Sequence, residues 1–99
     1  MKNFRTFHLA VEFHKLAREL SVARHLRDQL LRASSSIALN LAEGRGKPTV
    51  KDQKRFYSIA FGSLRECQAI LTLEEREDSA EWEMLDKLGA HLYRLIERA

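Results

Sequence analysis

A run of basic side chains in the middle of the chain has the composition to bind phosphate groups. Only one acid, Asp52, interrupts its members, which are Arg45, Lys47, Lys51, Lys54 and Arg55. Arg32 is expected to lie beside them if the flanking helices pack together. Such a cluster predicts binding to the nucleic-acid backbone, with little sequence preference and a strong dependence on salt. A solvated basic surface is the alternative meaning of the same run.

No other residues have the spacing of a catalytic or metal site. A di-metal centre in a helical bundle needs Glu three residues before His, but the residues at those positions are Arg5, Val11, Val22 and Leu88. Cys67 has no partner cysteine, and Gly44–Lys47 lacks the flanking residues of a phosphate loop. Ser34–Ser36 have no His and Asp partners that the sequence identifies. We therefore expect no metal, no cofactor and no enzymatic activity.

The composition fits one small domain over residues 1–99. With 44% hydrophobic and 31% charged residues, a chain of 99 residues can bury a single core. No run approaches the roughly 18 apolar residues of a membrane span, and the N-terminal residues lack the apolar stretch of a secretory signal. The lone Cys67 agrees with a reducing compartment. These features predict a cytoplasmic protein without a membrane partner.

Charge is distributed unevenly around a formal net charge of +3. Residues 2–32 carry seven basic side chains against three acids, whereas residues 74–99 carry eight acids against four basic side chains. This asymmetry indicates either a surface that binds polyanions or complementary charges between neighbouring subunits.

Helical periodicity runs through the chain and predicts the elements that position these residues. One proline, four glycines and the lack of alternating β-branched runs argue against strands. Ser21 and Thr49 are expected to cap the second and third helices, and the segment Asp78–Glu81 repeats the capping signal at the start of the fourth helix. The pattern predicts an all-α, antiparallel up-and-down four-helix bundle with helices over residues 5–20, 22–43, 49–74 and 79–98.

The third predicted helix is apolar over an unusually broad arc. Its hydrophobic side chains span roughly 200°, about twice the stripe that a surface helix needs. This helix is therefore either central in the bundle or in contact with another subunit. The candidate residues for an oligomer interface are Phe56, Tyr57, Phe61 and Leu64.

The end of the second predicted helix concentrates polar residues where the chain must turn. Gly44 is expected to adopt the left-handed conformation that commonly ends a helix. Asn40 is expected to bond the backbone of the following segment, and Glu43 to pair with Arg32 or Arg65. All of these roles are structural.

Two further residues are explained by structural roles. Gly62, inside the third helix, costs about 1 kcal/mol relative to alanine, which indicates either a close helix approach or a tolerated surface glycine. His14 lies on the apolar side of the first helix. We expect it to be partly buried and hydrogen-bonded rather than a general base.

Two segments resemble the signatures of a known family. Gln29–Ile37 followed by Asn40–Gly44 is similar to the Gln-Leu-x-Arg-Ala…Ser-Ile…Asn-Ile-Ala-Glu-Gly signature of the four-helix-bundle proteins known as 23S ribosomal RNA intervening-sequence proteins. Phe56–Glu66 resembles that family's second signature, an aromatic run leading to Ala-x-Gly-Ser-x-x-Glu. The resemblance covers residues 29–66 and assigns to the structural motif Asn40, Glu43, Gly44, Gly62, Ser63 and Glu66.

The resemblance implies a bacterial, cytoplasmic bundle that assembles into a ring, often a homopentamer. It also implies a relation to the accessory protein of diversity-generating retroelements, which binds nucleic acid and a reverse transcriptase. The family name describes where the genes lie and does not establish an activity. This chain departs from the pattern because the connection between the first two helices is reduced to about Ser21–Asp28. We therefore expect a longer second helix and a different geometry between subunits.

The leading hypothesis is a non-enzymatic, homo-oligomeric helical bundle that binds RNA or DNA phosphates with low sequence specificity. The apolar arc of the third helix motivates the oligomer, and the basic run motivates the ligand. The alternative is a protein-interaction adaptor whose basic face meets an acidic partner or a polymerase such as a reverse transcriptase.

Overall fold

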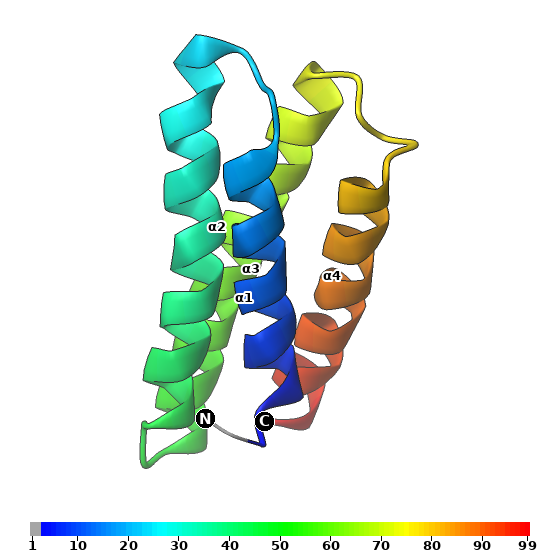
Figure 1. The fold of residues 1–99 in the computed structure, drawn as a ribbon. Coiled ribbons are helices and arrows are strands. Elements are labelled where there is room, and N and C mark those ends of the chain that lie inside the picture. Colours follow the sequence, from blue (N-terminus) through cyan, green and yellow to red (C-terminus); the bar gives the residue numbers. More distant parts are fainter. Residues whose placement is uncertain (1–2) are drawn as a thin grey trace.

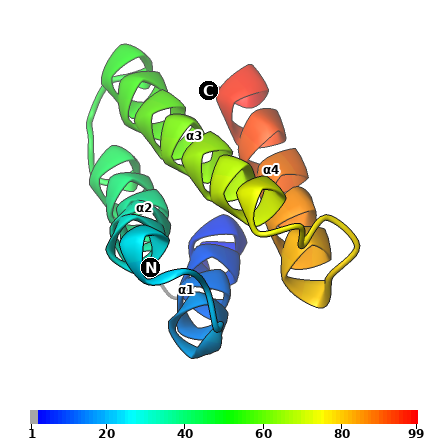
Figure 2. The ribbon, with the colours of Figure 1, turned by 90° about the horizontal axis from the view of Figure 1, so that it is seen from above.

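Four antiparallel helices make up the structure. A computed structural model describes residues 3–99, with helices α1 (Arg5–Glu19), α2 (Arg24–Arg45), α3 (Val50–Leu73) and α4 (Ala80–Arg98). They run alternately up and down a body of 40 × 22 × 22 Å (Figure 1). α2 and α4 each contact both α1 and α3, which leaves α1 and α3 diagonal to each other (Figure 2). The predicted four-helix bundle is confirmed, and each helix begins and ends within two residues of its predicted bounds.

Side-chain caps start α3 and α4 as predicted. The Thr49 hydroxyl accepts a hydrogen bond from the Asp52 backbone N–H at 3.2 Å, and the Ser79 hydroxyl accepts one from the Trp82 N–H at 3.1 Å. Each bond satisfies a first-turn donor that has no partner within its own helix. The predicted Thr49 cap is therefore confirmed, and the cap of α4 is Ser79, within the predicted segment Asp78–Glu81.

The start of α2 differs from the prediction. The helix begins at Arg24 with Ala23 at the N-cap, so Ser21 does not cap it. The Ala23 N–H donates instead to the Glu74 carboxylate at 2.7 Å, and the Arg76 guanidinium donates to the Ser21 carbonyl. Side chains that follow α3 therefore hold the connection between α1 and α2.

Arg76 also pairs with the buried Glu81 across the connection between α3 and α4. Arg76 Nη1 and Glu81 Oε2 are 2.8 Å apart. Burial by itself raises the pKa of Glu81, but hydrogen bonds from Arg76, from its own backbone N–H and from Ser79, together with the charge of Arg76, outweigh burial. The net effect holds the pKa of Glu81 below its ordinary value of 4.5.

The change Glu81→Gln is expected to lower the free energy of unfolding at neutral pH by about 1 kcal/mol. A carboxylate whose pKa is lowered by folding stabilises the fold above its unfolded pKa, and this contribution is lost as pH falls through the folded pKa. Wild-type stability should therefore decline more steeply below pH 4.5 than that of the variant. Urea unfolding from neutral to acid pH measures both profiles, and parallel profiles would contradict the stabilising pair.

The turn after α3 places a residue other than glycine in the left-handed region. Glu75 has a φ of 56°. The Arg76 N–H bonds the Leu71 carbonyl at 2.8 Å, and the Glu75 N–H bonds the Thr72 carbonyl at 3.0 Å. This is the Schellman pattern of a helix C-terminus, in which the left-handed position favours glycine.

Glu75→Gly is expected to raise the free energy of unfolding by about 0.5–1 kcal/mol, because relief of left-handed strain exceeds the added entropy of the unfolded chain. The corresponding rise in Tm is roughly 2–8 °C. Thermal unfolding measures the Tm of this variant. The control is Asp78→Gly, which changes an exposed residue of the same turn whose φ is not positive. A Tm at or below that of the wild type would show that the turn stores no such strain.

α3 packs against both α2 and α4, which buries part of its broad apolar arc, but every other helix also contacts two neighbours, so α3 is not central in the bundle. Tyr57 and Leu64, two of the predicted interface residues, are only 3% and 1% exposed within the single chain. The structure places them in the core instead, so they are not surface residues. Cys67 is also buried, which raises the pKa of its thiol to about 12. Phe56 and Phe61 are half-buried and keep part of their surface available to another subunit.

Gly44 has a packing role in place of the predicted turn role. None of the glycines in residues 3–99 has a positive φ, and Gly44 is buried inside α2. A Cβ at this position would lie 2.7 Å from Tyr57 Cε1 and 3.1 Å from Phe56 Cβ. α2 and α3 therefore approach too closely for a side chain here. Apart from its chain neighbours and its own helix backbone, a Cβ at Gly62 would meet no atom of residues 3–99 within 4 Å, so Gly62 is a tolerated surface glycine.

Candidate nucleic-acid interface

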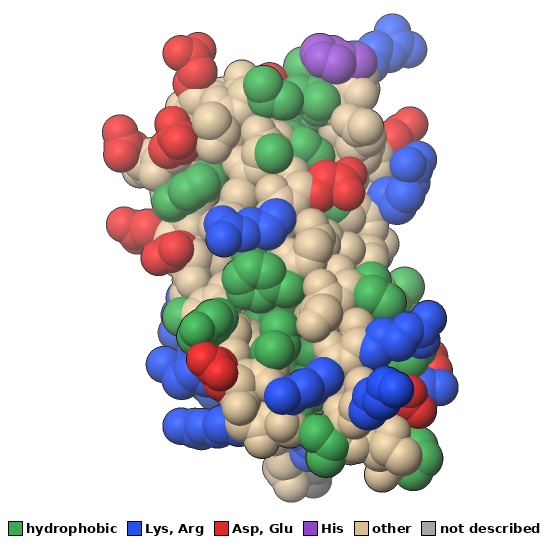
Figure 3. Space-filling view, turned by 180° about the vertical axis from the view of Figure 1, so that it is seen from behind, with side chains coloured by type: hydrophobic (Ala, Val, Ile, Leu, Met, Phe, Trp, Pro, Cys, Tyr) green, Lys and Arg blue, Asp and Glu red, His purple; other side chains and the backbone are tan. Residues whose placement is uncertain are grey.

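The predicted basic run lies at one end of the bundle. Arg45 closes α2, Lys47 lies in the connection, and the first turns of α3 carry Lys51, Lys54 and Arg55. All but the half-buried Lys47 are exposed. In Figure 3 the Lys and Arg side chains gather toward the lower end of the face, whereas Asp and Glu gather at its upper left. The structure therefore separates positive from negative charge along the long axis.

An aromatic ring orders two of these cations. Lys47 Nζ and Arg55 Cζ each lie 5.1 Å from the centroid of the Phe56 ring. A cation over an aromatic face is attracted to it by roughly 0.5–1 kcal/mol at an exposed site. Lys47 also pairs with Glu43, with 3.1 Å between Nζ and Oε2. These contacts hold both side chains near the α2–α3 connection.

The other cations of the run differ in how firmly they are held. The Arg45 guanidinium lies over the Phe4 ring, with Cζ 4.5 Å from its centroid. Among residues 3–99, Lys51 and Lys54 form no ion pair. These two exposed ammonium groups are therefore the ones most available to neutralise phosphates.

Arg32 does not belong to this cluster. It lies 13 positions before Arg45 on the same helix, which corresponds to roughly 20 Å along the axis at 1.5 Å per residue. Because α2 and α3 run antiparallel, the hydrogen bond between Ser36 and Ser63 lies between Arg32 and the basic run. The expectation that Arg32 joins the basic run is therefore wrong.

The structure adds three cations that the sequence interpretation missed. Arg5 begins α1, and Arg94 and Arg98 lie in the last turns of α4, so the up-and-down topology brings all three to the end where α2 meets α3 (Figure 1). Burial lowers the pKa of His91, and the charges of Arg94, Arg5 and Lys87, which lies one turn before His91 on α4, lower it further. We define the basic end by Arg5, Arg45, Lys47, Lys51, Lys54, Arg55, Arg94 and Arg98.

The polar residues near the end of α2 form a hydrogen-bond network within α2 that one bond extends to α3. The Asn40 side-chain amide donates to the carbonyl and hydroxyl oxygens of Ser36 at 2.9 and 3.0 Å, and the Ser63 hydroxyl donates to the Ser36 hydroxyl at 2.8 Å. Asn40 therefore does not bond the following segment as predicted. Ser63 joins α3 to this network, which gives its place in the sequence motif a structural reason.

The predicted ion pairs of Glu43 also differ from the observed ones. Glu43 pairs with Lys47 rather than with Arg32 or Arg65. Arg65 lies over Phe61 instead, with 5.3 Å between Cζ and the ring centroid. Glu66, the last residue of the second sequence motif, is exposed on α3.

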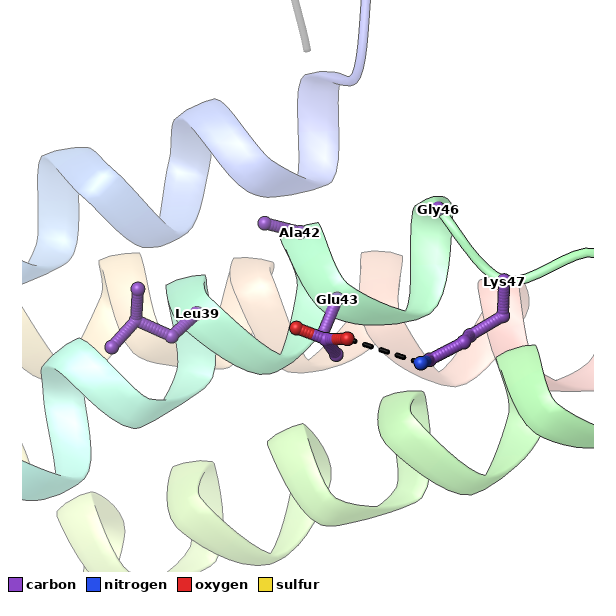
Figure 4. Close-up of a pocket in the computed structure, with 5 residues that line it drawn as sticks. All are labelled: Leu39, Ala42, Glu43, Gly46 and Lys47. Carbon is purple, nitrogen blue, oxygen red and sulfur yellow. Dashed lines mark ion pairs between the residues drawn. The ribbon is translucent and has the colours of Figure 1, made fainter.

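A hollow on the outer side of α2 shows no features of a small-molecule site (Figure 4). Its volume is about 380 Å³, and it is lined by Leu39, Ala42, Glu43, Gly46 and Lys47. The Glu43–Lys47 ion pair lies across it, so its two charged groups are already paired. All of its lining comes from the end of one helix and the residues that follow, which leaves it shallow.

The candidate catalytic side chains have structural partners. His14 Nδ1 and Ser34 Oγ are 2.7 Å apart, and the Ser34 hydroxyl donates to the Leu31 carbonyl at 3.2 Å. Ser34 is fully buried, so no substrate reaches it. Burial lowers the pKa of His14, and the charge of Arg18 lowers it further. The predicted hydrogen-bonded, partly buried His14 is confirmed.

The described residues contain neither a metal-binding group nor a membrane-spanning helix. No group of three or more His, Cys, Asp or Glu residues within residues 3–99 is arranged to hold a metal ion. Among those residues there is also no helix with the length and apolar character needed to cross a membrane.

Comparison with known families shows where this bundle belongs. A family model described as 23S rRNA-intervening sequence protein matches residues 4–98. The chain belongs to this family. The match extends beyond the two sequence motifs in residues 29–66, so the 23S rRNA-intervening sequence family pattern includes α1 and α4 as well. No curated protein and no solved structure matches the chain.

Proposed function

We propose that this member of the 23S rRNA-intervening sequence family is a non-enzymatic, homo-oligomeric bundle that binds the phosphate backbone of RNA or DNA with low sequence specificity. The observation that carries the proposal is the basic end, which collects cations from all four helices and the α2–α3 connection. Fewer acids lie on the same segments, namely Glu43, Asp52 and Glu97. Glu43 is paired with Lys47, and Glu97 accepts a hydrogen bond from the Tyr93 hydroxyl at 2.9 Å.

Low specificity follows from the kind of contact that this surface offers. Long Lys and Arg side chains at helix ends reach phosphate oxygens, and such contacts fix position without reading bases. The family name contains 23S rRNA, and although that name does not establish an activity, it makes RNA the first ligand to test.

Binding of a labelled, unstructured RNA at two salt concentrations tests the proposal. If about five phosphates are neutralised, the slope of log K against log salt is about −3.5 for a single strand. Affinity should then fall roughly 100-fold between about 50 and 200 mM salt. Fluorescence anisotropy measures both affinities. Absence of binding at the lower salt concentration, or an affinity that does not change with salt, would refute the proposal.

Exposed apolar side chains support the homo-oligomeric part of the proposal. Leu39 on α2 is 66% exposed, and on α3 Ile59 is 42% and Leu73 69% exposed. Contact with a second copy would remove such surface from water, which is favourable in proportion to the apolar area buried. Light scattering after size exclusion measures the mass in solution. A single species of 11.5 kDa would contradict self-association.

A further inference from the structure

A second hollow lies at the basic end, where α2, α3 and α4 meet. It has a volume of about 340 Å³, near the lower limit of small-molecule sites. We call it the terminal cleft, and its lining residues are Arg45, Gln53, Tyr57, Leu95, Arg98 and Ala99. No Asp or Glu side chain lines it. The cleft therefore combines two guanidinium groups with an apolar wall provided by Leu95.

Tyr57 contributes an unused hydrogen-bonding group to the terminal cleft. Only 3% of this residue is exposed, and its ring packs against Phe4 with 6.3 Å between the centroids. Its hydroxyl makes no hydrogen bond within residues 3–99, although buried hydroxyls normally have a partner. No fully buried side-chain oxygen or nitrogen among those residues lacks a partner, so the Tyr57 hydroxyl is not completely enclosed. Because Tyr57 also lines the cleft, we assign its hydroxyl as the donor to a ligand bound there.

The two arginines make the cleft positive from different helices. Arg45, at the end of α2, is positioned over the Phe4 ring with Cζ 4.5 Å from the centroid. Arg45 and Tyr57 line the same cleft, and the charge of Arg45 opposes the rise in the pKa of Tyr57 that burial causes. Arg98, in the last turn of α4, lines the same cleft. Gln53 is fixed beside them, because its amide donates to the Lys47 carbonyl at 2.9 Å.

We propose that the terminal cleft binds the terminal phosphate monoester of a nucleic-acid strand, an inference that rests on the proposed function of the basic end. A monoester carries between about −1.5 and −2 charges and three acceptor oxygens. It therefore matches two guanidinium groups and a phenol donor better than a singly charged backbone diester does. Guanidinium groups bind phosphate in bidentate fashion, which adds orientation to the charge attraction. The end of a strand can also enter the cleft, whereas a continuous backbone can only pass over it.

Three RNAs of one sequence test the proposal: one with a 5′-phosphate, one with a 3′-phosphate, and one with hydroxyl groups at both ends. At about 0.1 M salt, one additional phosphate contact is expected to strengthen binding roughly fivefold. At least one phosphorylated RNA should therefore bind about fivefold more tightly than the hydroxyl RNA. Equal affinities for all three would overturn the terminal cleft as a strand-end site and leave the proposed function intact. Absence of binding by all three would overturn both.

Two variants locate the preference. Tyr57→Phe removes only the hydroxyl, and Arg98→Gln removes one cleft charge; both are expected to abolish the fivefold preference, while Tyr57→Phe leaves affinity for the hydroxyl RNA unchanged. Lys54→Gln, outside the cleft, is the control and should weaken all three RNAs equally while keeping the preference. A preference that survives Tyr57→Phe would overturn the proposal.

Adenosine monophosphate that binds as tightly as the phosphorylated RNA would identify a free nucleotide as the ligand and overturn the strand-end assignment.

Discussion

Replacing Gly44 with valine is expected to lower the free energy of unfolding by about 3 kcal/mol, because overfilling a packed core is destabilising. The first side-chain carbon would lie 2.7 Å from the Tyr57 ring and 3.1 Å from Phe56 Cβ. Either α2 and α3 must separate or Tyr57 must leave a site in which it packs against Phe4. Both responses remove core contacts, and dense packing leaves little room to absorb the change. Urea unfolding followed by circular dichroism measures the loss.

Alanine at two glycine positions provides the matched control. Gly44→Ala gains about 1 kcal/mol of helix propensity but meets the same close contacts, so we expect a net loss. Gly62→Ala gains the same helix propensity, and its Cβ would make no close contact with other side chains or helices of residues 3–99. We therefore expect a stabilisation of about 0.5–1 kcal/mol. Similar effects at the two positions would show that α2 and α3 do not require glycine at their contact.

Changing Lys51, Lys54 and Arg55 together to alanine is expected to weaken RNA binding roughly 100-fold at about 0.1 M salt. Each phosphate contact contributes about 0.7 to the salt slope of a single strand, so three lost contacts reduce the slope by about 2. All three residues are exposed, and none donates a side-chain hydrogen bond that holds the bundle together within residues 3–99. Stability should therefore change little. Anisotropy titrations over a salt series measure affinity and slope together.

A second triple variant distinguishes the effect of where the charges lie from the effect of the total charge on RNA affinity. Lys15, Arg24 and Lys87 are also exposed, and they lie outside the basic end. Their replacement by alanine removes the same three charges and takes the formal net charge from +3 to 0, as in the first variant. We expect less than a threefold loss of affinity. Equal losses in both variants would mean that overall charge, rather than the basic end, governs binding.

Local sequence signals predicted the starts of α3 and α4 better than the start of α2. Thr49 and Ser79 cap these helices through bonds to residues three positions away, which a sequence pattern can reveal. Ser21 has the same residue type but no such role. The carboxylate that bonds the Ala23 N–H belongs to Glu74, 51 residues further along, and only the folded chain brings the two together. Tertiary contacts therefore override the local cap preference.

The basic run was predictable because its residues are neighbours in sequence. Lys51, Lys54 and Arg55 follow the α2–α3 connection and are visible as a run. Arg5 and Arg98 lie far from that run in sequence, yet the predicted antiparallel topology already implied their place at the same end. Gly44 and Tyr57 could not be predicted in this way. The close approach at Gly44 and the cleft beside Tyr57 depend on the distances between helices, which periodicity does not determine.

Lysine footprinting tests most directly whether nucleic acid binds at the basic end. The protein is acetylated with and without saturating RNA at about 50 mM salt, and mass spectrometry gives the modification rate of each lysine. We predict that RNA slows modification of Lys47, Lys51 and Lys54 several-fold and leaves Lys15 and Lys87 unchanged. Protection of Lys15 and Lys87 alone, or equal protection of all five lysines, would contradict binding at the basic end.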